Sequence, residues 1–244
     1  MKQLKMSALV LALTSIATGS AMAQSSNTNA WEGAYGQIGV GFGIFTPSIS
    51  NGKAVAPAPY SAANITTSAS SVNNVNTGLA NLALGYNFGI NQSYILGLGA
   101  TYYPGASSSA TGVLNSTAAA PYGALSSSTT ATYNVKNLFS IVLTPGYVID
   151  KDKLAYAKLG YTGATIGLSA PSIPYTTTNL TGWTLGLGYK QILTGSIYAF
   201  GEVNYAAYGN KGVATITSSS GAVLSGMSAK GTGTDILVGV GYRF

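Results

Sequence analysis

The chain of 244 residues contains no cysteine and no histidine, and only 7% of its residues are charged. Without cysteine there is no disulfide framework, no thiolate metal site and no lipidated N-terminal cysteine. Without histidine a Ser–His–Asp triad cannot be assembled. Ordinary soluble domains carry about 25% charged residues. A chain this poor in charge is therefore expected to face an apolar environment.

Long apolar runs are also missing. After the N-terminus no stretch approaches the roughly 18 consecutive apolar residues of a transmembrane helix. The chain is nevertheless 46% hydrophobic, with 32 glycines and 17 tyrosines. Glycine is poor in helix interiors, whereas tyrosine suits strands and membrane interfaces. This combination favours a membrane protein that is built from strands.

Residues 1–23 have the pattern of a secretory signal peptide. Lys2 and Lys5 form the charged start, and residues 8–17 (ALVLALTSIA) form a short apolar core. Ala21 and Ala23 make a small-x-small cleavage site, which leaves Gln24 as the new N-terminus. An uncleaved anchor is the alternative, but the apolar core is short and the cleavage site follows at once. We expect residues 24–244 to form one outer-membrane barrel domain.

From Trp31 onward the side chains alternate with a period of two, one register apolar and the other small or polar. Such alternation predicts strands with one face in lipid and one in a crowded interior. The predicted fold is all-β: an eight-stranded antiparallel up-and-down transmembrane β-barrel. Eight is an even number, as bacterial single-chain barrels require, and closure removes unpaired edges. The segments are 31–44, 75–88, 94–102, 136–147, 155–162, 182–189, 202–205 and 235–244.

The connections alternate between short and long. Short turns are predicted at 89–93, 150–153 and 191–196, and long Ser/Thr/Gly-rich loops at 47–71, 104–128, 168–178 and 208–229. Short turns are periplasmic in such barrels, so we expect both termini on the periplasmic side. Aromatic residues near strand ends are predicted to form interfacial girdles. These are Trp31, Tyr86, Phe88, Tyr94, Tyr102, Tyr147, Tyr161, Trp183, Tyr189, Tyr205 and Tyr242.

The last strand, residues 235–244 (DILVGVGYRF), resembles the last strand of the small eight-stranded family of OmpA-type transmembrane domains and opacity-type proteins. Residues 31–41 (WEGAYGQIGVG), 156–161 (YAKLGY) and 182–189 (GWTLGLGY) resemble its first, fifth and sixth strands. The likeness covers the whole mature chain, although each motif alone is degenerate. The chain stops at Phe244, so we do not expect the peptidoglycan-binding domain of full-length OmpA proteins.

The resemblance also implies an assembly signal. One register of the last strand is apolar and ends on an aromatic residue, which looks like the signal that outer-membrane proteins present to the barrel-assembly machinery. The residues in this register are Ile236, Val238, Val240, Tyr242 and Phe244. The implied partners are outer-membrane lipid and that machinery.

The charged residues of the barrel segments are predicted to face the lumen. Lys158 and Glu202 fall at similar heights and should pair, because burying an unpaired charge costs several kcal/mol. Lys190 and Arg243 should lie near the periplasmic mouth. Either the charges plug a narrow interior, as eight strands favour, or excess positive charge lines an anion-favouring pore. The predicted lumen charge network is Lys136, Lys158, Lys190, Glu202, Asp235 and Arg243.

No motif indicates an enzyme, a cofactor or a metal site. A Ser–Lys pair is formally open, but no spacing supports it. The net charge of +6 includes Lys2 and Lys5, and the other basic residues are scattered, so nucleic acid is not expected as a partner. We predict a monomeric, non-enzymatic barrel with a structural or surface-interaction role in the envelope. The alternatives are a narrow porin-like channel, including one that passes small hydrophobic molecules sideways into the membrane, and an adhesin that binds an extracellular ligand through its loops.

Overall fold

The computed structural model describes residues 29–106 and 108–244. The predicted signal peptide, with Ala21, Ala23 and Gln24, lies outside these residues. The elements in chain order are β1 (Gly33–Ile49), β2 (Gly52–Val55), β3 (Ile65–Ser70), β4 (Val75–Gly89), β5 (Tyr94–Tyr103), β6 (Ser109–Ala118), the 3-10 helix η1 (Gly123–Leu125), β7 (Ser127–Asp150), β8 (Lys153–Ala170), β9 (Ile173–Thr194), β10 (Ile197–Gly212), β11 (Ile216–Thr217), β12 (Val223–Ser225) and β13 (Ser228–Arg243).

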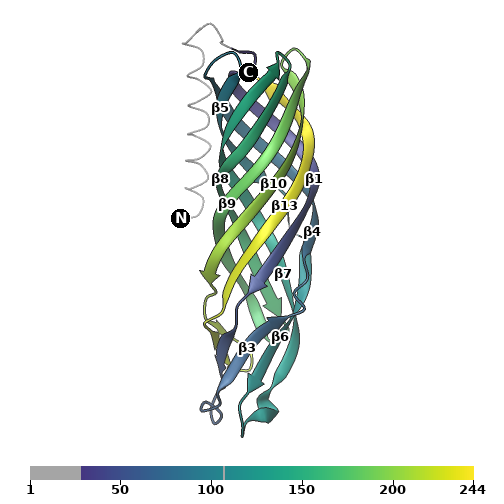
Figure 1. Cartoon of the computed structure of the whole chain (residues 1–244). Coiled ribbons are helices and arrows are strands. Elements are labelled where there is room, and N and C mark those ends of the chain that lie inside the picture. The colour runs from purple at the N-terminus through teal and green to yellow at the C-terminus, as the bar shows by residue number, and fades with distance from the viewer. Residues whose placement is uncertain (1–28, 107) are drawn as a thin grey trace, which may run out of the picture.

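Eight of these strands close into a ring in the order β1–β4–β5–β7–β8–β9–β10–β13, and β13 pairs back onto β1. Every pairing in the ring is antiparallel. Figure 1 shows the strands tilted around a long barrel, with the C-terminus at the end that carries the short turns. The predicted all-β, eight-stranded up-and-down barrel is confirmed. No helix in the described part of the chain is long and apolar enough to cross a membrane.

The ring strands turn glycines, polar side chains and several large aromatic or aliphatic side chains inward, and they turn a continuous apolar face outward. On β9, Thr184 is 6% exposed whereas its neighbours Trp183 and Leu185 are 47% and 45% exposed. Leu, Ile and Val side chains cover the outside between two aromatic girdles. The outer girdle is Tyr102, Phe139, Tyr161, Trp183 and Tyr205, and the turn-side girdle is Phe88, Tyr94, Tyr147, Tyr189 and Tyr242. From Trp183 to Tyr189 the strand covers about 20 Å at about 3.3 Å per residue.

The predicted long loops are largely strands. β2 and β3 fold within 47–71, β6 within 104–128, and β11 and β12 within 208–229. β8 and β9 run through 168–178 and leave only a tight turn after Ala170. The strand order β7–β6–β3–β2–β12–β11 builds an outer extension on the barrel, seen at the end opposite the C-terminus in Figure 1. Its small core includes Ile65, Leu114, Ile173, Ile216, Leu224 and Met227.

Candidate functional site

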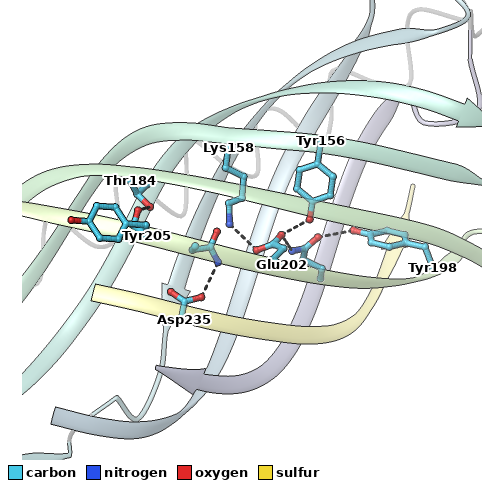
Figure 2. A network of polar contacts seen from close by, with 9 residues as sticks. Tyr156, Lys158, Thr184, Tyr198, Glu202, Tyr205 and Asp235 are labelled. Carbon is cyan, nitrogen blue, oxygen red and sulfur yellow. Dashed lines mark hydrogen bonds and ion pairs between the residues drawn. The ribbon is translucent and has the colours of Figure 1, made fainter. Parts of the chain in front are cut away.

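The candidate site is the lumen of the barrel, where polar side chains meet on the inner faces of the strands. Glu202 of β10 and Lys158 of β8 form an ion pair, with 2.7 Å between Nζ and Oε2. The residues are only 3% and 5% exposed. Figure 2 shows the two side chains pointing toward each other inside the barrel, from strands that are separated in the ring by β9. Because neither charge reaches bulk water, each depends on the other for stabilisation.

Three further residues complete this network. The Tyr156 hydroxyl donates a hydrogen bond to Oε1 of Glu202 at 2.5 Å. The Nε2 of Gln37 donates to the same oxygen at 3.2 Å, and its Oε1 accepts from the Tyr198 hydroxyl at 3.1 Å. Sequence reasoning did not name these residues as part of the network. Gln37 and Tyr156 do stand on the lumen-facing register of the period-two pattern, and that signal could have found them.

Lys190 lies in an aromatic cage on the turn side of the network. Its Nζ is 4.1 Å from the ring centroid of Tyr35, 4.9 Å from that of Tyr198 and 5.0 Å from that of Tyr156. The residue is 4% exposed. Within the described residues no carboxylate comes within ion-pair distance of it. Ring faces therefore supply the close attraction for this ammonium group.

Arg243 and Trp31 close the lumen at the turn end. The Arg243 guanidinium carbon lies 5.4 Å from the Trp31 ring centroid, and Nη2 donates to the carbonyl of Gly195 at 3.0 Å. Trp31 is 1% exposed and packs edge-on to Tyr198, with 5.7 Å between centroids. The prediction that Trp31 belongs to a membrane girdle is therefore wrong. The residue precedes β1, so strand alternation does not determine its direction.

Asp235 of β13 lies on the extension side of the ion pair. Its Oδ1 accepts a hydrogen bond from Nδ2 of Asn204 at 2.8 Å. The residue also borders a mainly apolar cavity of about 50 Å³, together with Leu79, Leu138 and Tyr208. The polar layer of the lumen thus gives way to apolar lining toward the extension.

The prediction that Lys136 faces the lumen does not agree with the structure. Its ammonium group lies 5.5 Å from the ring centroid of Tyr175, which is 52% exposed on the outer side of β9. The register between β7 and β8 shifts between Lys136 and Phe139, and Asn137 has a φ of 52°. This bulge adds a residue, so the alternation reverses and Lys136 moves to the outer face.

Glycines make room for the large lumen side chains. A Cβ added to Gly188 would lie 2.3 Å from Cζ of Tyr156, and one added to Gly241 would lie 2.2 Å from Cζ of Tyr198. Neither separation is sterically tolerable. The inward-facing positions are therefore glycine at these points, because aromatic rings from neighbouring strands occupy the space that a side chain would need.

The lumen contacts can hold side chains in place, but they do not form a recognisable catalytic or metal-binding arrangement. No group of three or more acidic side chains that could hold a metal ion occurs in the part of the chain that the structure describes. The side chains of the predicted assembly register all point outward. Tyr242 is 49% exposed and Phe244 is 78% exposed.

Neither a protein-family profile nor a curated protein sequence matches the chain. Solved structures do match in fold. OprG from Pseudomonas aeruginosa, an outer-membrane protein, aligns over 89% of this chain and 98% of its own, with a TM-score of 0.57 and 14% identity. Ail of Yersinia pestis covers 87% of this chain and 99% of its own (TM-score 0.42, 13% identity), and Neisserial surface protein A covers 87% and 100% (TM-score 0.38, 10% identity). The likeness to OprG shows that the chain has the fold of an outer-membrane β-barrel.

Proposed function

We propose that the protein is a non-conducting structural barrel of the bacterial outer membrane that presents its outer extension at the cell surface. The observation that carries this proposal is the filled lumen. The Trp31–Arg243 contact, the Lys190 cage and the Lys158–Glu202 network succeed one another along the interior. In an eight-stranded barrel the side chains alone can fill the available width.

The apolar belt between the two girdles supports the membrane location. Val40, Leu187 and Val238 are 62%, 70% and 57% exposed. A monomeric soluble protein rarely exposes so large a continuous apolar surface. A lysine or arginine at mid-bilayer on this belt would cost about 2–4 kcal/mol, and the charged side chains between the girdles point inward.

Planar-bilayer recording tests the closed lumen. The wild-type protein should give no steady conductance steps. Lys158→Ser/Glu202→Ser removes both charges together and shortens both side chains, so it should begin to pass small ions if it folds. Folding is checked by heat-modifiable gel mobility. Steady steps from the wild-type protein would favour the pore alternative and exclude the plug.

We also propose that both termini are periplasmic. Phe244 hydrogen-bonds to Ala34 at the end of the barrel that carries the short turns, and the long extension lies at the other end. Because the chain has no cysteine, single cysteines report directly on orientation. In intact cells Ser61→Cys should react with an impermeant maleimide, and Lys151→Cys should react only after lysis. The reverse pattern would overturn the orientation.

The resemblance of four strands to OmpA-type and opacity-type barrels agrees with a structural or surface role, and we propose membership of that broad group. We propose no enzymatic activity, since the chain lacks histidine and no hydrogen bond joins a serine hydroxyl to a lysine ammonium group among the described residues. The implied partners are outer-membrane lipid and the assembly machinery, and the barrel closes within one copy.

One observation favours a second function, sideways passage of small hydrophobic molecules. β4 pairs with β5 only from Leu82 onward, so its edge from Val75 to Asn81 has no β5 partner. Ala106 lies at this gap and lines the cavity of about 50 Å³.

Ala106→Trp should fill that cavity, and Ala80→Trp, on the exposed outer face of β4, is the matched control. Slower cellular uptake of a small apolar dye with Ala106→Trp alone would support sideways passage. Equal uptake by both variants would contradict sideways passage.

A further inference from the structure

The two ends of the barrel differ in their acidic residues. The chain has five acidic residues. Glu32, Asp150 and Asp152 lie at the turn end, while Glu202 and Asp235 face the lumen. The end that carries the extension therefore has no acidic residue. Its charged residues are the lysines Lys53, Lys136, Lys211 and Lys230, and the last two are exposed at the barrel rim.

Lys136 is the best defined of these lysines. It lies on the outer wall just beyond Phe139 of the outer girdle, so it stands at the level where lipid headgroups begin. The side chain is half-buried against Tyr175, whose hydroxyl donates to Oδ1 of Asn134 at 3.3 Å. Within the described residues no carboxylate lies within ion-pair distance of its ammonium group.

The backbone is bent to place Lys136 there. Without the bulge at Asn137 the alternation of β7 would turn this lysine into the lumen. Asn137 adopts a positive φ of 52°, a conformation that few non-glycine residues take. Bulges re-aim side chains, and here the result is an ammonium group above the aromatic girdle.

Uncharged hydrogen-bonding groups flank the lysine along the same row of the sheet. Lys136 pairs with Thr165 of β8, and Thr165 pairs with Asn179 of β9. The Thr165 hydroxyl donates to Oδ1 of Asn179 at 2.9 Å. On β13, Lys230 pairs with exposed Ser48 of β1. Lysine beside hydroxyl and amide groups suits a phosphorylated sugar, because both the phosphate and the sugar hydroxyls find partners.

We propose that Lys136, Lys211 and Lys230, the outer lysine collar, bind phosphorylated headgroups of glycolipids around the barrel in the outer leaflet, with Lys136 of β7 as the best defined contact and the other two on strands farther around the ring. The inference rests on the proposed outer-membrane location. The position directly above the outer girdle, at an end with lysines and no acidic residue, favours a membrane-anchored phosphate over a soluble one. Each lysine near an anionic lipid surface should strengthen binding about fivefold.

The test uses the full mature chain in phosphatidylcholine vesicles doped with bisphosphorylated lipid A or with its dephosphorylated form. Lipid retained by the protein after detergent extraction is measured by native mass spectrometry. The wild-type protein should retain the phosphorylated form at least about tenfold better. Lys136→Gln should reduce retention about fivefold, and Lys136→Gln/Lys211→Gln/Lys230→Gln about a hundredfold.

Lys151→Gln/Lys153→Gln removes lysines from the turn end and should retain lipid like the wild-type protein. Equal loss in this control, equal retention of dephosphorylated lipid, or unchanged retention in the collar variants would each overturn the proposal. Displacement by equimolar inorganic phosphate would identify a soluble-anion site instead. Insertion into the vesicles is measured first, by heat-modifiable gel mobility. A chain that fails to insert contradicts the membrane location and the collar with it, whereas insertion without enrichment contradicts the collar alone.

Discussion

Glu202 is the carboxylate on which the polar contacts of the lumen converge. Lys158, Tyr156 and Gln37 all donate to it from other strands. In so narrow an interior each oxygen is enclosed by protein, and a lost partner cannot be replaced by bulk water. Lys190 is held differently, since its close neighbours are the faces of aromatic rings.

Glu202→Gln should lower the free energy of unfolding by about 3–5 kcal/mol, because it leaves the Lys158 ammonium buried without a counter-charge. The measurement is urea unfolding in lipid vesicles, followed by heat-modifiable gel mobility. Lys153→Gln is the matched control. It breaks an exposed pair with Asp150 at 3.7 Å and should cost at most about 1 kcal/mol.

Lys158→Met/Glu202→Gln should recover part of the loss, because no uncompensated charge remains. An unchanged midpoint for Glu202→Gln would show that Glu202 does not stabilise the barrel.

At the scale of the strand, small inner residues and local bulges decide what each face presents. Gly188 of β9 lies against the ring of Tyr156, so this ring can reach Glu202 only because β9 has no side chain at that point. On β7 a bulge at Asn137 separates the part of the strand near the extension from the part near the turns. Odd-numbered residues face inward on one side of the bulge and even-numbered residues face inward on the other. Strand alternation therefore holds only between such irregularities.

Gly188→Val should destabilise the barrel by about 1–3 kcal/mol, because the new side chain overlaps the Tyr156 ring. Gly201→Ala on the neighbouring β10 is the control. Its added Cβ would approach nothing closer than 4.0 Å and should be tolerated. Tryptophan and tyrosine fluorescence during urea titration reports both variants. Equal stability of Gly188→Val and the wild-type protein would contradict close packing at this point.

At the scale of the whole molecule, a membrane-spanning ring continues into a sheet-built extension with its own core. The outer surface changes from Leu, Ile and Val between the girdles to Ser, Thr and Asn beyond them. That change matches a transition from hydrocarbon to water. The extension keeps its backbone groups paired through β-strand ladders, so its strands are not free loops.

Deletion of Phe244 should reduce the amount of folded barrel in cells without lowering the stability of the purified protein. Its side chain is 78% exposed and its N–H makes one backbone hydrogen bond, to Ala34, so the folded barrel loses few contacts, whereas the resemblance implies that the assembly machinery reads this residue during biogenesis. Quantifying the heat-modifiable form in membranes, alongside urea unfolding of refolded protein, separates the two effects. Normal assembly of the deletion variant would exclude Phe244 as a necessary signal.

The sequence by itself determined the strand architecture and most of the inward and outward faces. A period of two assigns opposite directions to neighbours such as Trp183 and Thr184, and it needs no knowledge of other strands. The pairing of Lys158 with Glu202 was also expected, because both stand on the inward register and an isolated buried charge is costly.

Only the tertiary structure decided the rest. Alternation says nothing of how side chains from separate strands meet inside a closed ring, so the cage around Lys190 and the place of Gln37 were not predicted. The bulge at Asn137 reversed the face of Lys136, because one extra residue inverts all the parity beyond it. Trp31 moved into the lumen for a related reason. It precedes the first strand, where packing against Tyr198 and Arg243 rather than backbone alternation sets its direction.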